Sequence, residues 1–210
     1  MKYGEIAFEV KALVHTILQC ERLVLNCMQR MSGIATAARY FVDAIASVGA
    51  SAKILDTRKT APGLRLLDKM AFAIGGGTNH RIGLFDMVMI KNNHIDACGG
   101  SITTAVQRVR ERDARKRPIE VEVRNFDELN EALALNVDRV MLDNMSPEDM
   151  RKAVALVDGR VALEASGNIT LETVAAVAAT GVDYISTGSV THSVKALDVS
   201  LWLSEARRGN

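Results

Sequence analysis

The stretch Ile54-Leu-Asp-Thr-Arg-Lys-Thr-Ala-Pro-Gly63 decides how the rest of the chain is interpreted. Its apolar first residues predict a strand that enters a sheet, and polar and cationic residues 57–59 follow at the carboxyl end of that strand. The Pro-Gly pair then predicts the start of a helix. Because open α/β folds bind ligands just beyond the carboxyl ends of their strands, this stretch predicts an anion-binding site.

From residue 52 onward, apolar runs alternate with helical patterns. Strands are expected at Lys53–Asp56, Met87–Ile90, Ile119–Val123, Arg139–Asp143, Val161–Ala165 and Tyr184–Ser186. The expected helix starts are Pro62, Ser101, Asn125, Ser146-Pro147 and Thr170. Strands separated by single helices indicate a parallel sheet with right-handed crossovers. Six strands are too few for an eightfold barrel, so the fold class expected is α/β, as an incomplete, open barrel.

The first fifty residues have a different pattern. Gly4–Lys11 alternates apolar and polar residues, which predicts a short strand. A helical region follows, which Ser32-Gly33 is expected to interrupt, and a second helix is expected to end before Gly49. The amino-terminal part is therefore expected to be helical, with the edge of a sheet before it.

Composition excludes several classes of function. The 210 residues carry a net charge of +1 and 4% aromatic residues, which argues against a nucleic-acid or membrane surface. No apolar run approaches a membrane span of about 20 residues. The start of the chain does not resemble a signal peptide. Cys20, Cys27 and Cys98 lack metal-ligand spacing and are expected to be reduced thiols, so a cytoplasmic location is expected.

Charged and amide-rich residues lie at every expected strand end. They are Thr57, Arg58 and Lys59, then Lys91, Glu122, Asp143, Ser166, Gly167, Asn168, Thr187, Gly188 and Ser189. Asn79-His80-Arg81 adds further donors between the first two strands. Arginine binds carboxylate or phosphate in a bidentate manner and lysine supplies a point charge, so the cationic members predict a multidentate anion receptor. A single such residue would more simply be a surface ion pair.

Two acids, Glu122 and Asp143, have three possible roles. They could hold Mg²⁺ beside phosphates, bind ribose hydroxyls, or stabilise a cationic sugar transition state. The structural alternative is an ion pair with Lys59 or Lys91. The turns at 166–168 and 187–189 are small and rich in backbone N–H groups, which suits a phosphate group.

Several motifs together carry a family resemblance. The motifs are Glu21-Arg22-Leu-Val-Leu-Asn26, Gln29–Thr36, Asp56–Gly63, Gly75–Arg81, Ile90–His94, Glu120–Val123, Leu142–Met145, Leu163–Gly167, Gly181–Ser186 and Thr191–Lys195. In this order they resemble quinolinate phosphoribosyltransferase, and they cover nearly the whole chain. The resemblance implies a pentosyltransferase of NAD biosynthesis, which converts quinolinate and phosphoribosyl pyrophosphate to nicotinate mononucleotide, pyrophosphate and CO₂ with Mg²⁺.

The resemblance also implies roles for individual residues. Arg58, His80, Arg81, Lys59 and Lys91 would surround the quinolinate carboxylates and the pyrophosphate. Glu122 and Asp143 would face the ribose and the Mg²⁺-pyrophosphate, and with Lys59 they are the expected catalytic residues. Ser166–Asn168 and Thr187–Ser189 would bind the 5′-phosphate. Arg22 would reach the active site of a neighbouring subunit, so a homodimer or higher homo-oligomer with shared sites is implied.

One departure from the family pattern concerns the amino terminus. The family has a fuller α/β sandwich domain before the helix that contains Arg22. Residues 1–33 are therefore expected to be a remnant of that domain with a linking helix, and residues 34–210 to be the barrel domain. Two alternatives to the active enzyme follow: a truncated homologue that binds anions or subunits without turnover, and a phosphoribosyltransferase for another base.

Overall fold

The computed structural model describes residues 4–203, and its centre is a sheet of six parallel strands. The strands are β1 (Lys53–Leu55), β2 (Val88–Ile90), β3 (Ile119–Val123), β4 (Arg139–Asp143), β5 (Ala162–Ser166) and β6 (Tyr184–Ser186). Their order in the sheet is β1-β6-β5-β4-β3-β2. The first two strands of the chain therefore lie at opposite edges, and the barrel is open between them.

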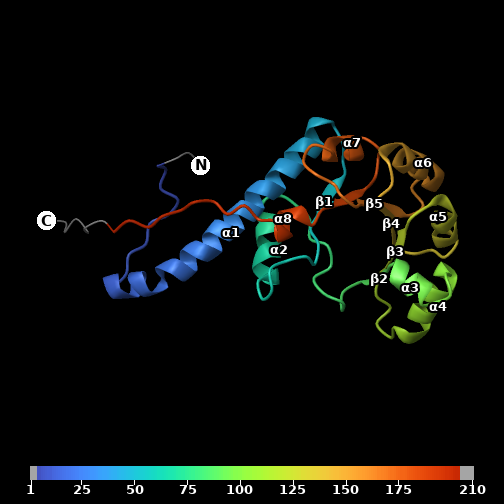
Figure 1. Cartoon of the computed structure of the whole chain (residues 1–210), viewed down its shortest axis with the longest axis horizontal. Helices are drawn as coiled ribbons and strands as arrows, with labels where there is room; N and C mark the ends of the chain where they lie inside the picture. Colours follow the sequence, from blue (N-terminus) through green and yellow to red (C-terminus); the bar gives the residue numbers. More distant parts are fainter. Residues whose placement is uncertain (1–3, 204–210) are drawn as a thin grey trace.

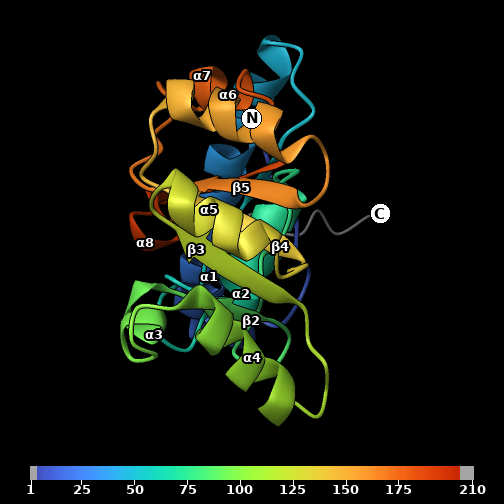
Figure 2. The same ribbon diagram turned by 90° about the vertical axis from the view of Figure 1, so that its right-hand side faces the viewer.

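Helices connect the strands and cover the outer face of the sheet (Figures 1 and 2). They are α1 (Val14–Ser47), α2 (Arg65–Ile74), α3 (Asn92–Asp96), α4 (Ile102–Arg112), α5 (Phe126–Leu133), α6 (Pro147–Val157), α7 (Val174–Ala178) and α8 (Ser189–His192). Figure 2 shows α4, α5 and α6 in front of the strands. The arrangement is the incomplete α/β barrel that the alternation of patterns predicted.

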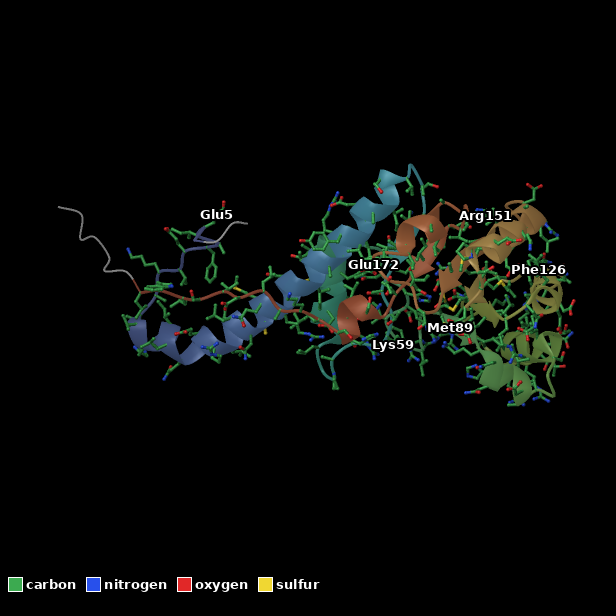
Figure 3. All side chains as sticks on the ribbon, turned by 45° about the horizontal axis from the view of Figure 1, so that its top comes forward. Glu5, Lys59, Met89, Phe126, Arg151 and Glu172 are labelled. Carbon is green, nitrogen blue, oxygen red and sulfur yellow. The ribbon has the colours of Figure 1, made fainter. Side chains whose placement is uncertain are left out.

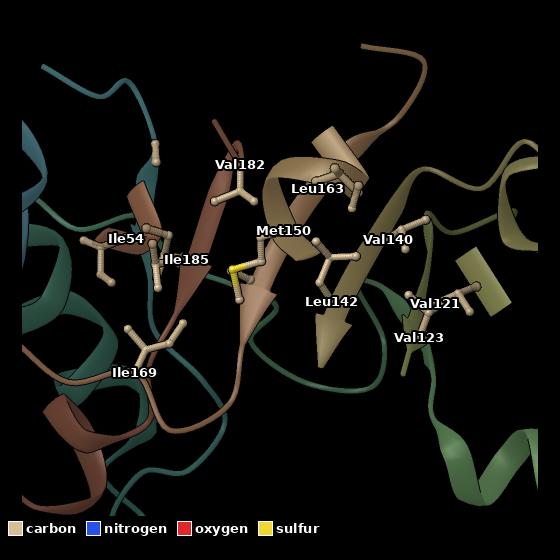
Figure 4. Close-up of a cluster of buried hydrophobic side chains, with 14 of the residues drawn as sticks. Ile54, Val121, Val123, Val140, Leu142, Met150, Leu163, Ile169, Val182 and Ile185 are labelled. Atoms are coloured by element: carbon tan, nitrogen blue, oxygen red, sulfur yellow. The ribbon is translucent and has the colours of Figure 1, made fainter. Parts of the chain in front are cut away.

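The core lies between the sheet and these helices. Alternate strand residues such as Val121, Val140 and Leu163 are at most 2% exposed and belong to one apolar cluster with Met150 of α6 (Figure 4). The intervening residues of the same strands face the barrel interior, since neighbouring strand residues point to opposite sides. This second set includes Glu120 and Glu164, so the interior is polar where the outer layer is apolar.

Most of the predicted element boundaries are confirmed. β3, β4 and β6 have the predicted bounds, β1 and β2 are one residue shorter than predicted, and β5 is shifted by one residue at both ends. Ser146 caps α6 by accepting a hydrogen bond from the Asp149 N–H, with Pro147 in the first turn. Ser101 and Asn125 cap α4 and α5 in the same way.

Two helix starts were predicted wrongly. The helix after β1 begins at Arg65 and not at Pro62, because residues 60–64 form a loop that Asp68 holds through the Ala61 N–H. Helix α7 begins at Val174, since the Thr170 N–H bonds the Thr173 hydroxyl in a separate turn. In both places a local side-chain hydrogen bond replaces the first turn of the helix.

The amino-terminal predictions need two corrections. Gly4–Lys11 is not a strand, because no strand within residues 4–203 lies beside it to supply the hydrogen bonds that its alternation would need. The helix is also not interrupted at Ser32-Gly33, and α1 continues to Ser47. Gly33 is instead a contact point. A Cβ there would lie 2.3 Å from the Lys195 carbonyl oxygen, so glycine permits close packing inside a continuous helix.

The first half of α1 extends away from the barrel (Figure 1). A carboxyl-terminal stretch runs beside it, with the Leu197 N–H bonded to the Gln29 carbonyl and the Gln29 side chain bonded to the Val199 carbonyl. Figure 3 shows Glu5 at the opposite end of the molecule from Phe126 and Arg151. Within residues 4–203, no helix is long and apolar enough to span a membrane.

Candidate active site

The carboxyl ends of all six strands meet at one edge of the sheet, because the strands are parallel. This edge, the barrel mouth, therefore brings together the predicted residues that follow the strands. They are Thr57, Arg58, Lys59, Lys91, Glu122, Asp143, Ser166, Gly167, Asn168, Thr187, Gly188 and Ser189. A single bridge between Leu55 and Thr78 adds the segment with His80 and Arg81 next to β1.

Arg58 and Arg81 form the cationic centre of the mouth. Burial lowers the pKa of Arg81, and the charge of Arg58 lowers it further, so the two guanidinium groups act on each other electrostatically. The Arg81 guanidinium also donates to the Met87 carbonyl at 3.1 Å, which directs it toward β2. Among the described residues Arg58 has no ion-pair partner. Two half-buried cations whose charges act on each other are suited to a ligand with two neighbouring anionic groups.

His80 lies deeper, inside the barrel. Its Nε2 atom is 3.0 Å from a Glu120 oxygen and 3.3 Å from a Glu164 oxygen, and both carboxylates are fully buried. Glu164 also pairs with Arg139 at 3.0 Å. Burial lowers the pKa of His80, but the two carboxylates more than offset this and raise it to about 9. His80 thus links the mouth to a buried charged layer.

The three side chains of this layer also have the composition of a metal site, His with two Glu, and their ligand atoms lie within 4.8 Å of one another. The hydrogen bonds of His80 argue against a metal. Its Nδ1 atom accepts the Arg81 backbone N–H at 2.7 Å, so the neutral ring carries its proton on Nε2. The protonated ring carries a proton there too. In neither state does Nε2 have the lone pair that a metal needs.

Glu122 and Asp143 lie on neighbouring strands, and the register places both on the inward face. A Glu122 oxygen accepts from the Lys91 ammonium at 2.8 Å, so the ion pair considered as an alternative is present. The Lys91 side chain is 44% exposed, which leaves it able to turn toward a ligand. Two carboxylates are too few for an all-protein metal cage. They do suit Mg²⁺, which keeps waters and substrate phosphates as its other ligands.

The turns after β5 and β6 complete the mouth. Asn168 donates to the Asn144 side chain at 3.1 Å, and Thr187 shares a hydrogen bond with Ser189 at 2.9 Å. Gly188 packs against Lys59: a Cβ there would lie 3.0 Å from the Lys59 Cδ. The absence of a side chain at this position thus brings the lysine beside the turn. A cation and several N–H groups together can bind a phosphate.

Arg22 is the one predicted site residue that the structure does not bring to the mouth. It is exposed on the extended half of α1. It lies eight residues before Arg30, whose guanidinium pairs with Asp68 at 2.7 Å and fixes α1 to the barrel. Eight helical residues correspond to about 12 Å along the axis. The roles expected for this and the other site residues stay predictions.

Sequence reasoning missed five polar residues behind the mouth: the buried Asp56, Lys69, Glu120 and Glu164, and the half-buried Arg139. The sequence did contain a signal for the two glutamates, namely the alternation of residues along their strands. In Ile119-Glu-Val-Glu-Val123, period-two alternation puts Glu120 on the same face as Glu122, and Glu164 likewise shares a face with Ser166. Lys69 carries no such signal, because a lysine in an amphipathic helix is usually solvated.

Comparison with known proteins identifies relatives along most of the chain. Residues 34–202 match the family model described as "Quinolinate phosphoribosyl transferase, C-terminal domain". A quinolinate phosphoribosyltransferase [decarboxylating] 1b of Nicotiana tabacum is 50% identical over 96% of this chain and 60% of its own length. A probable nicotinate-nucleotide pyrophosphorylase [carboxylating] of Bacillus subtilis is 47% identical over 94% of this chain and 68% of its own.

Solved structures give the same result for the fold. The nicotinate-nucleotide pyrophosphorylase of Francisella tularensis matches with a TM-score of 0.84 and 50% identity, over 89% of this chain and 65% of that one. The chain thus spans about 60% of the length of its plant relatives.

Proposed function

The chain belongs to the quinolinate phosphoribosyltransferase family, and from this premise we propose that it makes nicotinate mononucleotide for NAD biosynthesis. The reaction joins the quinolinate ring nitrogen to ribose C1 of phosphoribosyl pyrophosphate as pyrophosphate leaves. The carbon–carboxylate bond next to that nitrogen then breaks. Its electron pair stays on the ring carbon beside the now positive nitrogen as CO₂ departs, and that carbon then takes a proton from water. The enzyme is a pentosyltransferase in this proposal.

The observation that carries the proposal is the pair of guanidinium groups at the mouth, Arg58 and Arg81, whose charges repel each other. Quinolinate has two carboxylates on neighbouring ring atoms, and a pair of bidentate donors matches that spacing of charge. Binding of this dianion would also relieve the repulsion that lowers the pKa of Arg81. A base with a single carboxylate would leave one of the two cations unpaired, which favours quinolinate over nicotinate.

The acidic side of the mouth faces the sugar. Ribose C1 becomes cationic as pyrophosphate departs, and the carboxylates of Glu122 and Asp143 stabilise that charge. Lys91, which Glu122 holds in the free protein, and Lys59 balance the charge of the leaving group. Mg²⁺ bound with pyrophosphate would supply further charge neutralisation, and Glu122 and Asp143 would hold it through its waters.

The 5′-phosphate has a place in the turns 166–168 and 187–189. Both turns offer backbone N–H groups and hydroxyl donors on the inner rim of the barrel, next to Lys59. Loops after the last strands of α/β barrels are frequent phosphate sites. Binding there would place ribose C1 between the acids and the arginine pair.

A homodimer or higher homo-oligomer with shared sites is part of the proposal. The extended part of α1 and the segments beside it expose large apolar side chains, namely Ile6, Phe8, Val10, Leu13, Val14, Leu18, Leu23, Val24, Trp202 and Leu203. Contiguous exposed apolar surface marks an interaction site. A second copy seated on it would receive the exposed Arg22 near its own mouth.

A cytoplasmic location is proposed because the three cysteines, Cys20, Cys27 and Cys98, are unpaired, as is usual in a reducing compartment.

The test is turnover of labelled quinolinate. Protein incubated with phosphoribosyl pyrophosphate, Mg²⁺ and quinolinate labelled in the 2-carboxylate should release labelled CO₂ and pyrophosphate in equal amounts. Nicotinate in place of quinolinate should give neither product at a comparable rate. Preferential use of nicotinate would favour the alternative base. Quinolinate binding to folded protein without CO₂ release would favour the binding-only homologue.

A further inference from the structure

A gap in the sheet separates β1 from β2, and one segment of chain spans it. Thr78 pairs with β1 through two hydrogen bonds, in which the Thr78 N–H bonds the Ile54 carbonyl and the Asp56 N–H bonds the Thr78 carbonyl. The pairing then ends. Three residues later the chain reaches Arg81, whose guanidinium group donates to the carbonyl of Met87, the residue before β2. Among the described residues, no strand lies beside the backbone between these points.

A buried ion pair takes over where the strand pairing ends. Lys69 of α2 is 3% exposed, and its ammonium group is 2.6 Å from an Asp56 oxygen. The same ammonium donates to the His80 carbonyl at 2.9 Å. The same Asp56 oxygen accepts the His80 backbone N–H at 2.8 Å. The two side chains therefore bond both backbone groups of His80, as a neighbouring strand would.

Asp56, Lys69 and the backbone of His80 form a clamp. This clamp joins the segment that carries Arg58 to the segment that carries Arg81. Asp56 directly precedes the segment 57–59 that carries Arg58. His80 directly precedes Arg81, and the His80 ring accepts the Arg81 N–H at 2.7 Å. The relative position of the two guanidinium groups thus depends on one lysine in the core. A fully desolvated lysine is costly, and hydrophobic packing alone would be served better by an apolar side chain.

We infer that Lys69 is a positioning residue, which through Asp56 and His80 sets the spacing between Arg58 and Arg81 for two adjacent carboxylates. The inference rests on the proposed function for the identity of the ligand. Lys69 touches no substrate in this assignment. Its contribution is to the geometry of recognition, where a displacement of about 1 Å can cost about a hundredfold.

The first experiment measures the clamp without any substrate. In Lys69→Met the ammonium is lost at similar volume, and the amides of His80 and Arg81 should exchange hydrogen with solvent at least about tenfold faster. The single variant leaves the Asp56 carboxylate buried without its cation, which can unfold the protein. The double variant Asp56→Asn/Lys69→Met removes both charges, so it provides a folded protein for the same measurement. Lys53→Met, which removes an exposed lysine of β1, is the matched control and should exchange as the unaltered protein does.

The second experiment separates positioning from general damage. In the Lys69 variants the KM for quinolinate should rise about ten- to a hundredfold, while the KM for phosphoribosyl pyrophosphate stays within about twofold. Unchanged amide exchange would overturn the clamp. Faster exchange with both KM values raised equally would overturn the positioning role. Absence of turnover in the unaltered protein would overturn the proposed function instead, and the exchange result would still decide the clamp.

Discussion

At the residue scale, the choice of arginine for both cations of the central pair matters for recognition. A guanidinium group offers parallel N–H donors in a fixed plane, whereas an ammonium group is a compact point charge. Arg81 is half-buried and already donates to the Met87 carbonyl and the Met89 sulfur, so its orientation is fixed before a ligand arrives. Pre-ordering of this kind reduces the entropy lost on binding.

We therefore predict that Arg81→Lys weakens quinolinate binding specifically. The lysine keeps the charge but loses one of the two parallel hydrogen bonds to a carboxylate, so the KM for quinolinate should rise about tenfold or more. Steady-state kinetics with each substrate varied in turn measure this change. Arg160→Lys, which alters an arginine that bonds only the end of α6, should leave both KM values unchanged. Equal effects of the two substitutions would contradict the prediction.

His80 gives the protein a pH-dependent stability. Its pKa is about 9 in the folded protein, above the value of 6.5 that an unperturbed histidine has. The folded state thus binds a proton more tightly, and this contribution is fully present below pH 6.5 and is lost as the pH rises through 9. The difference corresponds to at most about 3 kcal/mol, and the Arg81 N–H at Nδ1 opposes part of it.

Urea unfolding between pH 6 and pH 9.5 measures this effect. The unaltered protein should lose stability across the upper part of that range. His80→Gln, which cannot take up the proton, should be less stable at low pH and should show a flatter pH profile. Parallel profiles for the two proteins would show that His80 does not titrate in this way.

At the element scale, α1 is one continuous helix although its sequence contains Ser32-Gly33. Glycine in a helix normally costs about 1 kcal/mol relative to alanine. Here it allows the strap formed by residues 195–199 to cross the helix backbone in direct contact. The tertiary contact outweighs the local preference.

Gly33→Ala should consequently destabilise the protein, although it raises helix propensity. The new Cβ would meet the Lys195 carbonyl oxygen at 2.3 Å, and separating the two segments should cost about 1 to 3 kcal/mol. The midpoint of chemical unfolding reports this loss. Ser32→Ala, one position earlier and half-buried, is the control and should change stability by less than about 0.5 kcal/mol. Stabilisation by Gly33→Ala would mean that the strap does not lie against α1.

At the scale of the whole molecule, the barrel mouth and Arg22 lie on different parts of the chain. The exposed apolar surface of α1 supplies a reason for two copies to associate. If the sites are shared, a defect on α1 of one subunit and a defect in the barrel of the other fall in the same site of a mixed dimer. One complete site then remains in each mixed dimer.

Mixing two inactive variants tests this arrangement. Arg22→Ala and Glu122→Gln should each lose most activity alone. After unfolding and refolding together, they should recover roughly a quarter of the unaltered activity, because half of random dimers are mixed and each has one intact site. Leu18→Glu, placed on the exposed face of α1, should reduce both dimer mass and this recovery. A monomer with full activity would contradict the shared site.

Much of the fold could be predicted from local pattern. The strands β3, β4 and β6 follow from apolar runs of the right length, and the caps at Ser101, Asn125 and Ser146 follow from side-chain chemistry within three residues. The residues at the mouth follow as well, because parallel strands must end at the same edge. These inferences need no information about distant parts of the chain.

Other features depend on contacts that no local pattern encodes. Alternation in Gly4–Lys11 predicts a strand, but a strand exists only where another lies beside it, and none does among the described residues. Lys69 is typical of a solvated helix face by its position. It is buried because Asp56 and the His80 backbone need its donors where the sheet is open.

The sequence by itself determined the parallel α/β architecture, the edge of the sheet at which the candidate site lies and the chemical types of the groups there. Only the tertiary structure decided that Gly33 is a packing contact, that His80 faces buried carboxylates and that a core lysine joins the two arginine-bearing segments. The physical reason is that helix and strand periodicity and capping act between neighbours in the chain. The protonation and orientation of a buried polar group depend on whichever distant groups the fold places within about 3 Å of it.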